Sequence, residues 1–598
     1  MFKIVNQLFS LLSSSQRKNF YALQILIVIM AFMEIVGVAS IIPFMSLVGD
    51  MNQLQQDTFI AKVYKSSGVN SENQFVFILG IVVLVMLLIS AIISMFTTWR
   101  LSLFASRIGA DIGARLYNYY LNQNWLFHAS GNSAHLTKQI VNEVGRTTGG
   151  ILMPLMQMNA RIVLAIFMTL TIFIYDPKVA LLGLLMFAIT YFIIFVLVRM
   201  RLYRNGNMIT KVSEQRFRLM SEGFGGIKDL ILLGRDADFV NRFIKSGHKL
   251  AYGQGTNAAL TQMPRFFIEL LAFGSMISLV LYLMASYDDD LGLILPILSV
   301  YALATFKLLP AFQLIYACIA DIKSNIPAYE AIQKDLIRSQ HTEFKEDKLE
   351  KGYFPLKQKI SLENISFTYP SKDKPVLNQL NISIPAKSVV GIVGPSGSGK
   401  STLIDILLGL IEPQYGKLKI DNMVLDNQNR RLWQNTIGFV AQNIFLSGGT
   451  IAENIAFGVS QDQIDIDKVK QAIKLAHLDE LLQSLEDGIY TEVGERGVQL
   501  SGGQRQRIGI ARALYHEAEV LMFDEATSSL DGITEKMIME AIHDFSGEKT
   551  IIMIAHRLKT IEKCDQIFFI DNGQLVDQGT YKELIESNEH FKKMALHV

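Results

Sequence analysis

Cysteine is almost absent from this 598-residue chain, which holds only Cys318 and Cys564. The two lie far apart and show no metal-ligand spacing, so a disulfide framework and a zinc site are both excluded. A surplus of charge is also lacking, because 56 Lys and Arg balance 55 Asp and Glu. The net charge of +1 gives no reason to expect a nucleic-acid partner. Charged residues make up 19% of the chain and hydrophobic residues 50%, which excludes a wholly soluble enzyme.

Six apolar runs are long enough to cross a membrane. A bilayer's hydrocarbon core is about 30 Å thick, and a helix rising about 1.5 Å per residue needs about 20 residues to span it. The runs are Phe20–Val48, Phe75–Phe96, Ile151–Tyr175, Val179–Val198, Pro264–Tyr287 and Leu291–Ala320. The sequence therefore predicts a membrane α-helical domain of six spans within residues 1–325.

The basic residues indicate how these spans are oriented. Lys and Arg are concentrated between Arg199 and Lys249, whereas the turn Asp288–Asp290 has none. The positive-inside rule then places both termini and the longer connections in the cytoplasm. Those connections contain few helix breakers, so we expect the membrane helices to continue as long cytoplasmic helical extensions.

A polar linker, residues 326–358, is predicted to separate the membrane half from a second domain at residues 359–598. Its charged, polar part begins at Ser339 and reaches the start of the second domain at Lys359. Beyond it, β-branched runs lead to a glycine-rich turn and then to a helical pattern. This order is typical of an α/β nucleotide-binding domain.

The glycine-rich turn fits the phosphate-binding pattern G-x-x-x-x-G-K-S/T between a strand and a helix. Glycines let backbone N–H groups surround phosphates, Lys400 adds a positive charge, and Ser401 supplies a hydroxyl for Mg²⁺. The candidate nucleotide-binding residues here are Gly394, Ser396, Gly397, Ser398, Gly399, Lys400, Ser401 and Thr402.

A second strand, Val520–Phe523, ends in two carboxylates. Asp524 is suited to hold Mg²⁺, and Glu525 to polarise the attacking water. With the phosphate loop, this pair predicts an α/β P-loop domain that binds and hydrolyses a nucleotide.

At this point the sequence resembles the ABC transporter family. The signature motif is intact at Leu500–Gln504, the glutamine loop has Gln442, and the switch histidine is His556. Ser528–Asp531 resembles the loop that crosses the dimer interface, and Thr491–Gly497 the segment that faces the membrane domain. The resemblance implies that Glu525, His556 and Gln442 are catalytic, and that Ser401, Gln442 and Asp524 bind Mg²⁺. It implies nucleotide contacts from Tyr369, Ser501, Gly502, Gly503 and Gln504.

The resemblance also implies how the chain assembles. In the family, the signature motif of one copy contacts the γ-phosphate bound at Lys400 of the other, so we expect a homodimer that encloses two ATP molecules. Six spans ahead of the nucleotide domain resemble an exporter. Short coupling helices are implied near Trp125–Gly131 and Ser221–Gly226.

Five charged residues lie inside or at the ends of apolar spans: Glu34, Arg161, Arg265, Glu269 and Lys307. Such charges are costly in a bilayer and indicate function. Structural roles are the alternative: the arginines could reach the inner interface, or Arg161 could pair with Glu269.

The membrane half resembles the PglK-type flippases of lipid-linked oligosaccharides. The resemblance is clearest at Met263–Phe266 with Glu269 and at Phe306–Pro310. It implies that Arg265 and Lys307 bind a substrate diphosphate. Where the branch has a third basic residue, this chain has Ser90 or a neighbour, and residues 51–67 are predicted to form a small external helix.

Three functions remain open from the sequence. The first is ATP-driven flipping of a lipid-linked oligosaccharide or a similar anionic amphiphile across a bacterial inner membrane. The second is export of a peptide or a hydrophobic drug, and the third is a non-transporting, ATP-gated regulator. Intact Glu525 and His556 argue against the third.

Overall fold

The computed structural model of the chain forms two compact units. Unit 1 comprises residues 1–123 and 127–344, and unit 2 comprises residues 124–126 and 345–598. The structure describes residues 2–49, 51–54, 59–69, 71–131, 133–175, 177–286, 291–341, 352–370, 372–494, 497–525, 532, 535–536, 539–540, 542, 545–555 and 557–596.

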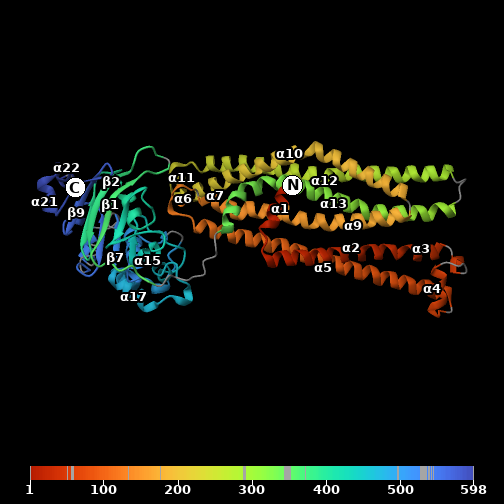
Figure 1. Cartoon of the computed structure of the whole chain (residues 1–598), viewed down its shortest axis with the longest axis horizontal. Coiled ribbons are helices and arrows are strands. Elements are labelled where there is room, and N and C mark those ends of the chain that lie inside the picture. The colour runs from red at the N-terminus through yellow and green to blue at the C-terminus, as the bar shows by residue number, and fades with distance from the viewer. Residues whose placement is uncertain are drawn as a thin grey trace. The chain divides into compact units, whose positions relative to one another are not determined.

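Unit 1 is built from long helices that lie side by side (Figure 1). Its long helices are α2 (Ser14–Ala39), α5 (Glu72–Leu121), α9 (Met153–Tyr175), α10 (Pro177–Gly225), α12 (Asp236–Ser286) and α13 (Leu291–Arg338). Its shorter elements are α1 (Phe2–Ser10), α3 (Ile41–Gly49), η1 (Met51–Leu54), α4 (Phe59–Ser67), α7 (Ser133–Lys138), η2 (Gln139–Glu143), α8 (Val144–Thr147), η3 (Thr148–Leu152), α11 (Ile227–Leu233) and η4 (Ser339–His341). The first two residues of α6 (Trp125–Ser130) belong to unit 2 and the others to unit 1. The prediction of a helical membrane domain is confirmed.

The described residues of every predicted span are helical, apart from Ser40. Among the described residues, Ser14–Gly37, Glu72–Leu121 and Ser133–Leu170 are long and apolar enough to cross a membrane. The first predicted run is broken at Ser40, between α2 and α3. Pro43 explains the break, because a proline clashes with the carbonyl group four residues before it.

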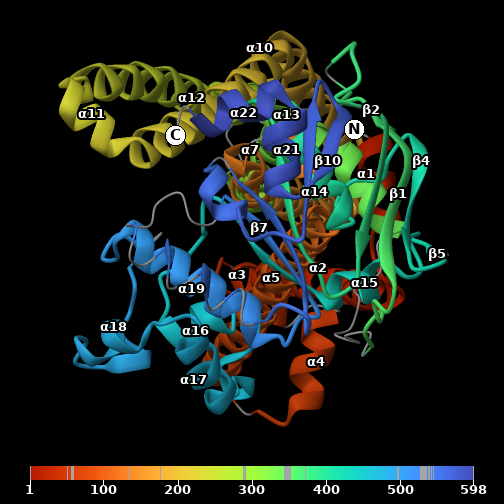
Figure 2. The same cartoon turned by 90° about the vertical axis from the view of Figure 1, so that its left-hand side faces the viewer.

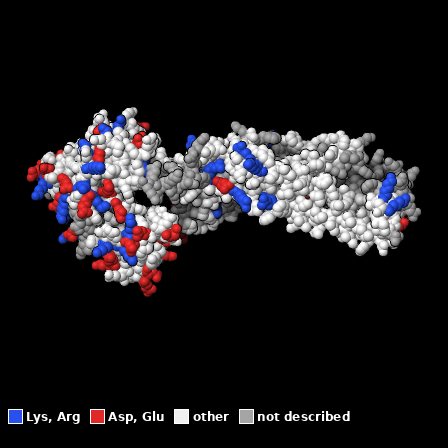
Figure 3. All heavy atoms as spheres, turned by 60° about the horizontal axis from the view of Figure 1, so that its bottom comes forward, with Lys and Arg blue, Asp and Glu red and all other residues white. Residues whose placement is uncertain are grey.

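The helical extensions expected from the sequence are present. Helix α5 has 50 residues, which corresponds to about 75 Å at about 1.5 Å per residue, more than twice the hydrocarbon thickness. Helices α10 and α12 are of similar length. Figure 3 shows a face of the long helices whose middle has little exposed charge, with Lys and Arg gathered towards their ends.

Two short helices correspond to the implied coupling helices. The first is α6, where it was expected. The second is α11, which begins just after the expected Ser221–Gly226, because the last turns of α10 occupy Ser221–Gly225. Gly226 starts α11, and Gly234, with φ of 59°, ends it in the left-handed conformation that glycine favours. Helix α11 joins the ends of the paired helices α10 and α12 (Figure 2).

Unit 2 contains two sheets. The antiparallel sheet has the order β2-β1-β4-β5, and the other sheet has the order β10-β9-β3-β8-β7-β6. The strands are β1 (Lys359–Phe367), β2 (Leu377–Pro385), β3 (Val389–Val393), β4 (Tyr415–Ile420), β5 (Met423–Val424), β6 (Ile437–Val440), β7 (Val520–Asp524), β8 (Thr550–Ile554), β9 (Gln566–Asp571) and β10 (Gln574–Gly579). The helices are α14 (Lys400–Leu407), α15 (Arg430–Thr436), α16 (Ile451–Ile455), α17 (Ile466–Leu475), α18 (Asp479–Gln483), α19 (Gly502–Tyr515), α21 (Tyr581–Ser587) and α22 (Glu589–Leu596), with short turns η5 (Gln461–Gln463), η6 (Gly488–Tyr490) and η8 (Leu558–Ile561).

The larger sheet separates two apolar cores. Along β3, Val389 and Val393 pack into one core, whereas Val390 and Ile392 pack into the other. Strands β3, β8, β7 and β6 are parallel, so their carboxyl ends meet at one edge of the sheet. That edge is where ligands bind in open α/β sheets.

Candidate nucleotide and membrane sites

The loop between β3 and α14 needs glycine for its backbone. Gly394, Gly397 and Gly399 have φ angles of 158°, 82° and 103°. A Cβ atom at Gly399 would lie 2.8 Å from Leu377 Cδ2 and 2.9 Å from the carbonyl oxygen of Val376. The loop leads into the N-terminus of α14, whose first N–H groups have no intrahelical partners and therefore favour an anion.

Lys400 is held inside this loop. Its side chain is buried, and Nζ donates hydrogen bonds to the carbonyl oxygens of Gly394 and Pro395 at 2.8 and 2.9 Å. Burial lowers the pKa of Lys400 below its usual value, while the carboxylates of Glu525 and Asp524 oppose that shift. The positive charge is therefore positioned by backbone groups, close to the acidic pair.

The structure brings Gln442 and Glu525 together. Gln442 follows β6, and its Nε2 donates a hydrogen bond of 2.6 Å to Glu525 Oε2. Glu525 follows β7 with φ of 51°, and its N–H donates to the carbonyl oxygen of Ile554 at the end of β8. The turn thereby directs a carboxylate to the sheet edge that also carries the phosphate loop.

Tyr369 lies beside the first turn of α14. Its hydroxyl is 3.2 Å from the Thr402 hydroxyl, and its ring packs edge-on against Phe367, with centroids 5.0 Å apart. A half-buried aromatic ring at this place is suited to stack on a flat base.

The signature motif forms the start of α19. Ser501 Oγ accepts a hydrogen bond from Gln504 N at 3.2 Å, and Ser501 N donates to Gln504 Oε1 at 2.8 Å. This capping box fixes the helix start. Gly502 and Gly503 follow without side chains that could cover it.

Several predicted residues lie outside the described part of the chain. They are His556, residues 495–496 of the segment Thr491–Gly497, and Ser528–Asp531.

The resemblance implied that a helix near Trp125–Gly131 contacts the nucleotide domain, but sequence reasoning did not identify the partner residue. Trp125 Nε1 donates a hydrogen bond of 3.2 Å to Asp405 Oδ2 on α14, and Leu126 packs against the core behind the phosphate loop. Burial raises the pKa of Asp405 to about 6, although the bond from Trp125 lowers it. The sequence signal for this contact was Trp125 itself, a large aromatic residue in the connection between two predicted spans.

In unit 1, Arg161 on α9 joins a polar cluster with two other helices. Arg161 Nη1 lies 3.9 Å from Glu34 Oε1 on α2, and Ser94 on α5 donates to the same oxygen at 2.9 Å. Glu34 is thus already hydrogen-bonded, and Arg161 keeps 36% of its side chain exposed.

The possible Arg161–Glu269 pair is wrong. Glu269 instead accepts a hydrogen bond of 2.6 Å from Arg265 Nε, one helical turn earlier on α12, and one of 3.4 Å from Gln313. The short bond forms because residues four apart lie on one helix face. The side chain of Lys307 lies outside the described residues.

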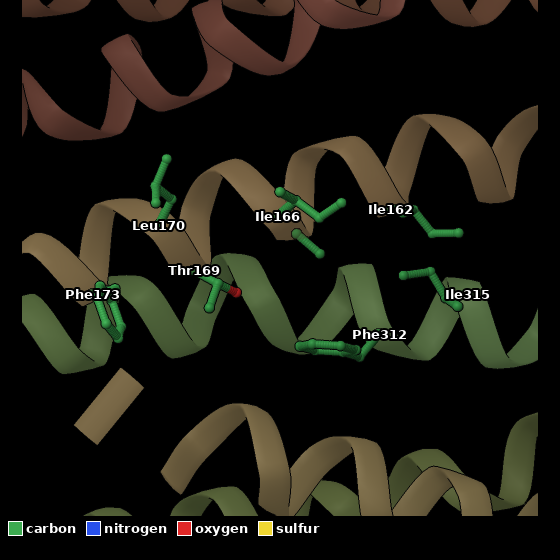
Figure 4. A pocket seen from close by; sticks show the side chains of 8 residues that line it. Ile162, Ile166, Thr169, Leu170, Phe173, Phe312 and Ile315 are labelled. Carbon is green, nitrogen blue, oxygen red and sulfur yellow. The ribbon is translucent and has the colours of Figure 1, made fainter. Parts of the chain in front are cut away.

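An apolar groove of about 520 Å³ follows Arg161 along α9, within the third and sixth predicted spans. Figure 4 shows its side chains between α9 and α13, with the hydroxyl of Thr169 standing out from a carbon lining. The lining residues are Ile162, Ala165, Ile166, Thr169, Leu170 and Phe173 on α9, and Phe312 and Ile315 on α13.

Two family models match the chain. The model described as ABC transporter matches residues 377–528, and the model described as ABC transporter transmembrane region matches residues 38–251. Together they cover more than half of the sequence and fall on the two units separately.

Curated relatives agree with these matches. A protein of Cupriavidus pinatubonensis named ATP-dependent lipid A-core flippase is 27% identical over 508 residues, 82% of each chain. Proteins of the same name from Vibrio vulnificus and Escherichia coli are 40% and 38% identical over shorter stretches, 40% and 38% of this chain and 41% and 39% of theirs.

The fold is also that of a solved transporter. A structure described as a bacterial Atm1-family ABC exporter with ATP bound aligns with a TM-score of 0.78 and 20% identity, covering 98% of this chain and 99% of that one. The chain therefore belongs to the ABC transporter family and has the exporter fold, with a membrane domain fused to a domain that binds ATP and hydrolyses it to drive transport.

Proposed function

We propose that this transporter flips a lipid with an anionic headgroup, most simply a lipid-linked oligosaccharide or related glycolipid. The observation that carries the proposal is the partly exposed Arg161 on α9, one residue before Ile162, with which the carbon lining of the groove begins. An amphiphile needs a cation for its phosphate and an apolar path for its chain. The relatives named ATP-dependent lipid A-core flippase support a substrate of this class.

Arg265 and Lys307 remain proposed headgroup ligands. Arg265 is 61% exposed and shares its charge with Glu269, so it offers a phosphate a guanidinium that is already oriented. An unpaired phosphate in hydrocarbon costs several kcal/mol or more, which is why the path requires cations.

The nucleotide site supports ordinary ATP hydrolysis. Lys400 and the loop N–H groups would hold the β- and γ-phosphates, Glu525 would polarise water, and Gln442 would orient Glu525 through their hydrogen bond. By the family resemblance, we assign the role of the catalytic switch histidine to His556.

The same site fits Mg²⁺. Ser401, Gln442 and Asp524 offer hydroxyl, amide and carboxylate oxygens, which are the hard ligands that Mg²⁺ prefers. Ser401 is exposed in the first turn of α14. When bound, Mg²⁺ would neutralise charge on the transferred phosphate.

We propose that two copies form the working transporter. Helix α11 has no buried residue, and its exposed apolar side chains include Ile231, Leu232 and Leu233 at 68, 74 and 71%. A helix tip this apolar needs a cover. A second copy would supply one, and it would also present Ser501 to the phosphates held by Lys400.

We further propose a bacterial inner-membrane location with unit 2 and both termini in the cytoplasm. The basic segment from Arg199 to Lys249, on the extensions of α10 and α12, supports this orientation.

The test is headgroup translocation in vesicles with a polyprenyl-diphosphate sugar. Arg161→Gln should lower ATP-driven translocation at least tenfold while basal ATP hydrolysis persists. A matched control is Arg242→Gln, which removes an exposed guanidinium from another ion pair on α12. Equal translocation by the Arg161 variant and the control would contradict the proposal.

Export of an uncharged hydrophobic compound is the second candidate, because the groove itself is lined almost wholly by carbon. This second function would be favoured if the Arg161→Gln variant still transported apolar dyes and if those dyes still stimulated its ATPase activity.

A further inference from the structure

The helix that carries Arg161 contains two irregular turns below it. Residues 133–175 form one continuous helix, in which η2 (Gln139–Glu143) and η3 (Thr148–Leu152) are π-helical and flank α8. Each π turn accommodates one extra residue without adding a turn. Such turns are rare, and where they persist they are frequently at functional sites.

A buried ion cluster surrounds Glu143, the last residue of the first π turn. Glu143 is fully buried, and its two carboxylate oxygens lie 3.3 Å from Lys138 Nζ and 3.2 Å from Arg146 Nη1. Lys138 is only 1% exposed. Removing these three charges from water costs several kcal/mol each, so stability alone is a weak reason for the cluster.

The cluster holds the π turns against two neighbouring helices. Arg146 Nη1 donates to Thr210 on α10 at 2.7 Å, and Arg146 Nε donates to Asn325 on α13 at 3.2 Å. Lys138 also lies 3.6 Å from Glu214 on α10. The irregular segment is therefore held by directional polar contacts, which can exchange partners, rather than by apolar packing alone.

At the second π turn the backbones approach closely. A Cβ atom at Gly150 would collide with the side chain of Asn325, and one at Gly109 would collide with Thr148. These glycines let η3 fit between α5 and α13.

The polar contacts of the cluster are incomplete. Among the described residues, Arg146 Nη2 and Gln139 Oε1 are buried without a hydrogen-bond partner. An unsatisfied buried polar group costs about 1–3 kcal/mol. Because the observed arrangement of the cluster bears this cost, a second arrangement that satisfies these atoms would be close to it in free energy.

We propose that η2, α8 and η3 form a joint that turns α9 during transport, with the Lys138–Glu143–Arg146 cluster setting its two positions. Conversion of one π turn to α-helix would rotate the helix beyond it by about 100°, the angle per residue. Arg161 and the groove residues of α9 would then face a different direction. The inference rests on the proposed function, in which Arg161 meets the headgroup.

The rotation is measured with a nitroxide attached at Ile166→Cys, an exposed groove position, after replacement of the buried Cys318 and Cys564. The ratio of collisions with oxygen and with a water-soluble nickel chelate reports whether the label faces lipid or water. Adding a non-hydrolysable ATP analogue should change this ratio at least threefold.

The role of the ion cluster in the rotation is tested with one triple variant, Lys138→Met, Glu143→Leu and Arg146→Met. Replacing buried ions by apolar residues of similar size is often neutral or stabilising, so the variant should fold and hydrolyse ATP at a basal rate. The nucleotide-dependent change of the label should be lost. If the triple variant misfolds, Glu143→Gln is used, and the matched control is Arg242→Gln with Asp238→Asn, an exposed pair on α12.

Two results would overturn the joint. One is a label that does not respond to nucleotide in the otherwise unaltered chain, and the other is an equal response in the cluster variant. Either result would leave the role of Arg161 standing if Arg161→Gln still blocks translocation. The opposite result is also informative. If Arg161→Gln does not lower translocation but the label still responds to nucleotide, the proposed lipid substrate is contradicted and the proposed joint is retained.

Discussion

Lys400 in the nucleotide loop and Arg161 in the membrane domain hold positive charge in opposite ways. Lys400 is bound by two backbone carbonyl groups of its own loop, six or fewer residues away. Arg161 is placed by Glu34, which lies on another helix 127 residues earlier. A site built from local backbone leaves a motif in the sequence, whereas a site built from distant side chains leaves only isolated charges.

The largest expected effect tests the local site. Glu525→Gln keeps the side-chain shape and the phosphate loop but removes the base that polarises water, so ATP turnover should fall about 10²- to 10⁴-fold. ATP binding, measured by filter retention, should persist. Lys400→Ala should weaken binding itself, so the two variants fail differently. Near-normal turnover by Glu525→Gln would refute the assignment.

A smaller effect is expected from the loop backbone. Gly399→Ala forces an alanine to φ of 103° and against Leu377, which should destabilise the loop by about 1–3 kcal/mol and weaken ATP binding. Gly255→Ala on α12 is the control, because its Cβ would meet no atom within 4 Å. It should leave thermal unfolding unchanged or slightly improved. Equal melting temperatures for both variants would show that the loop tolerates a side chain.

The smallest effect concerns the contact of Trp125 with Asp405. Since burial raises the pKa of Asp405 to about 6, the folded chain keeps a proton that the unfolded chain loses near pH 4. The stabilisation is therefore full below about pH 4 and is lost as the pH rises through about 6. Relative to Asp405→Asn, the unaltered protein should lose about 2 kcal/mol across this range.

This pH dependence is measured by thermal unfolding of the full chain at several pH values. Asp462→Asn, which changes an exposed acid in η5, serves as the control and should track the unaltered protein. Parallel curves for Asp405→Asn and the unaltered protein would contradict the raised pKa.

The sequence predicted the parts of the molecule whose causes are local. Apolar runs of sufficient length predicted the helices of unit 1, and Gly394–Thr402 predicted the strand, loop and helix around the phosphates. The short helix α6 was also expected in the right place.

The parts that were not predicted depend on contacts between distant residues. Helical periodicity does not reveal a π turn, because η2 is held by partners on other helices. Glu143 accepts a hydrogen bond from Thr210 on α10, and Gln139 donates one to the carbonyl oxygen of Ala331 on α13. The pairing of Arg161 with Glu34 rather than Glu269 likewise depends on which helices are neighbours. Helix α11 was misplaced because α10 continues through Gly223 to Gly225, although glycine disfavours a helix interior.

The central claim, that ATP hydrolysis moves an anionic headgroup along the path marked by Arg161, is tested by comparing two lipids in vesicles. One carries a diphosphate-linked sugar, and the other carries the same sugar through an uncharged linkage. The account predicts that ATP speeds the transfer of the charged lipid at least tenfold more than that of the neutral one, and that Arg161→Gln removes this preference. Equal ATP-driven transfer of both lipids would contradict it.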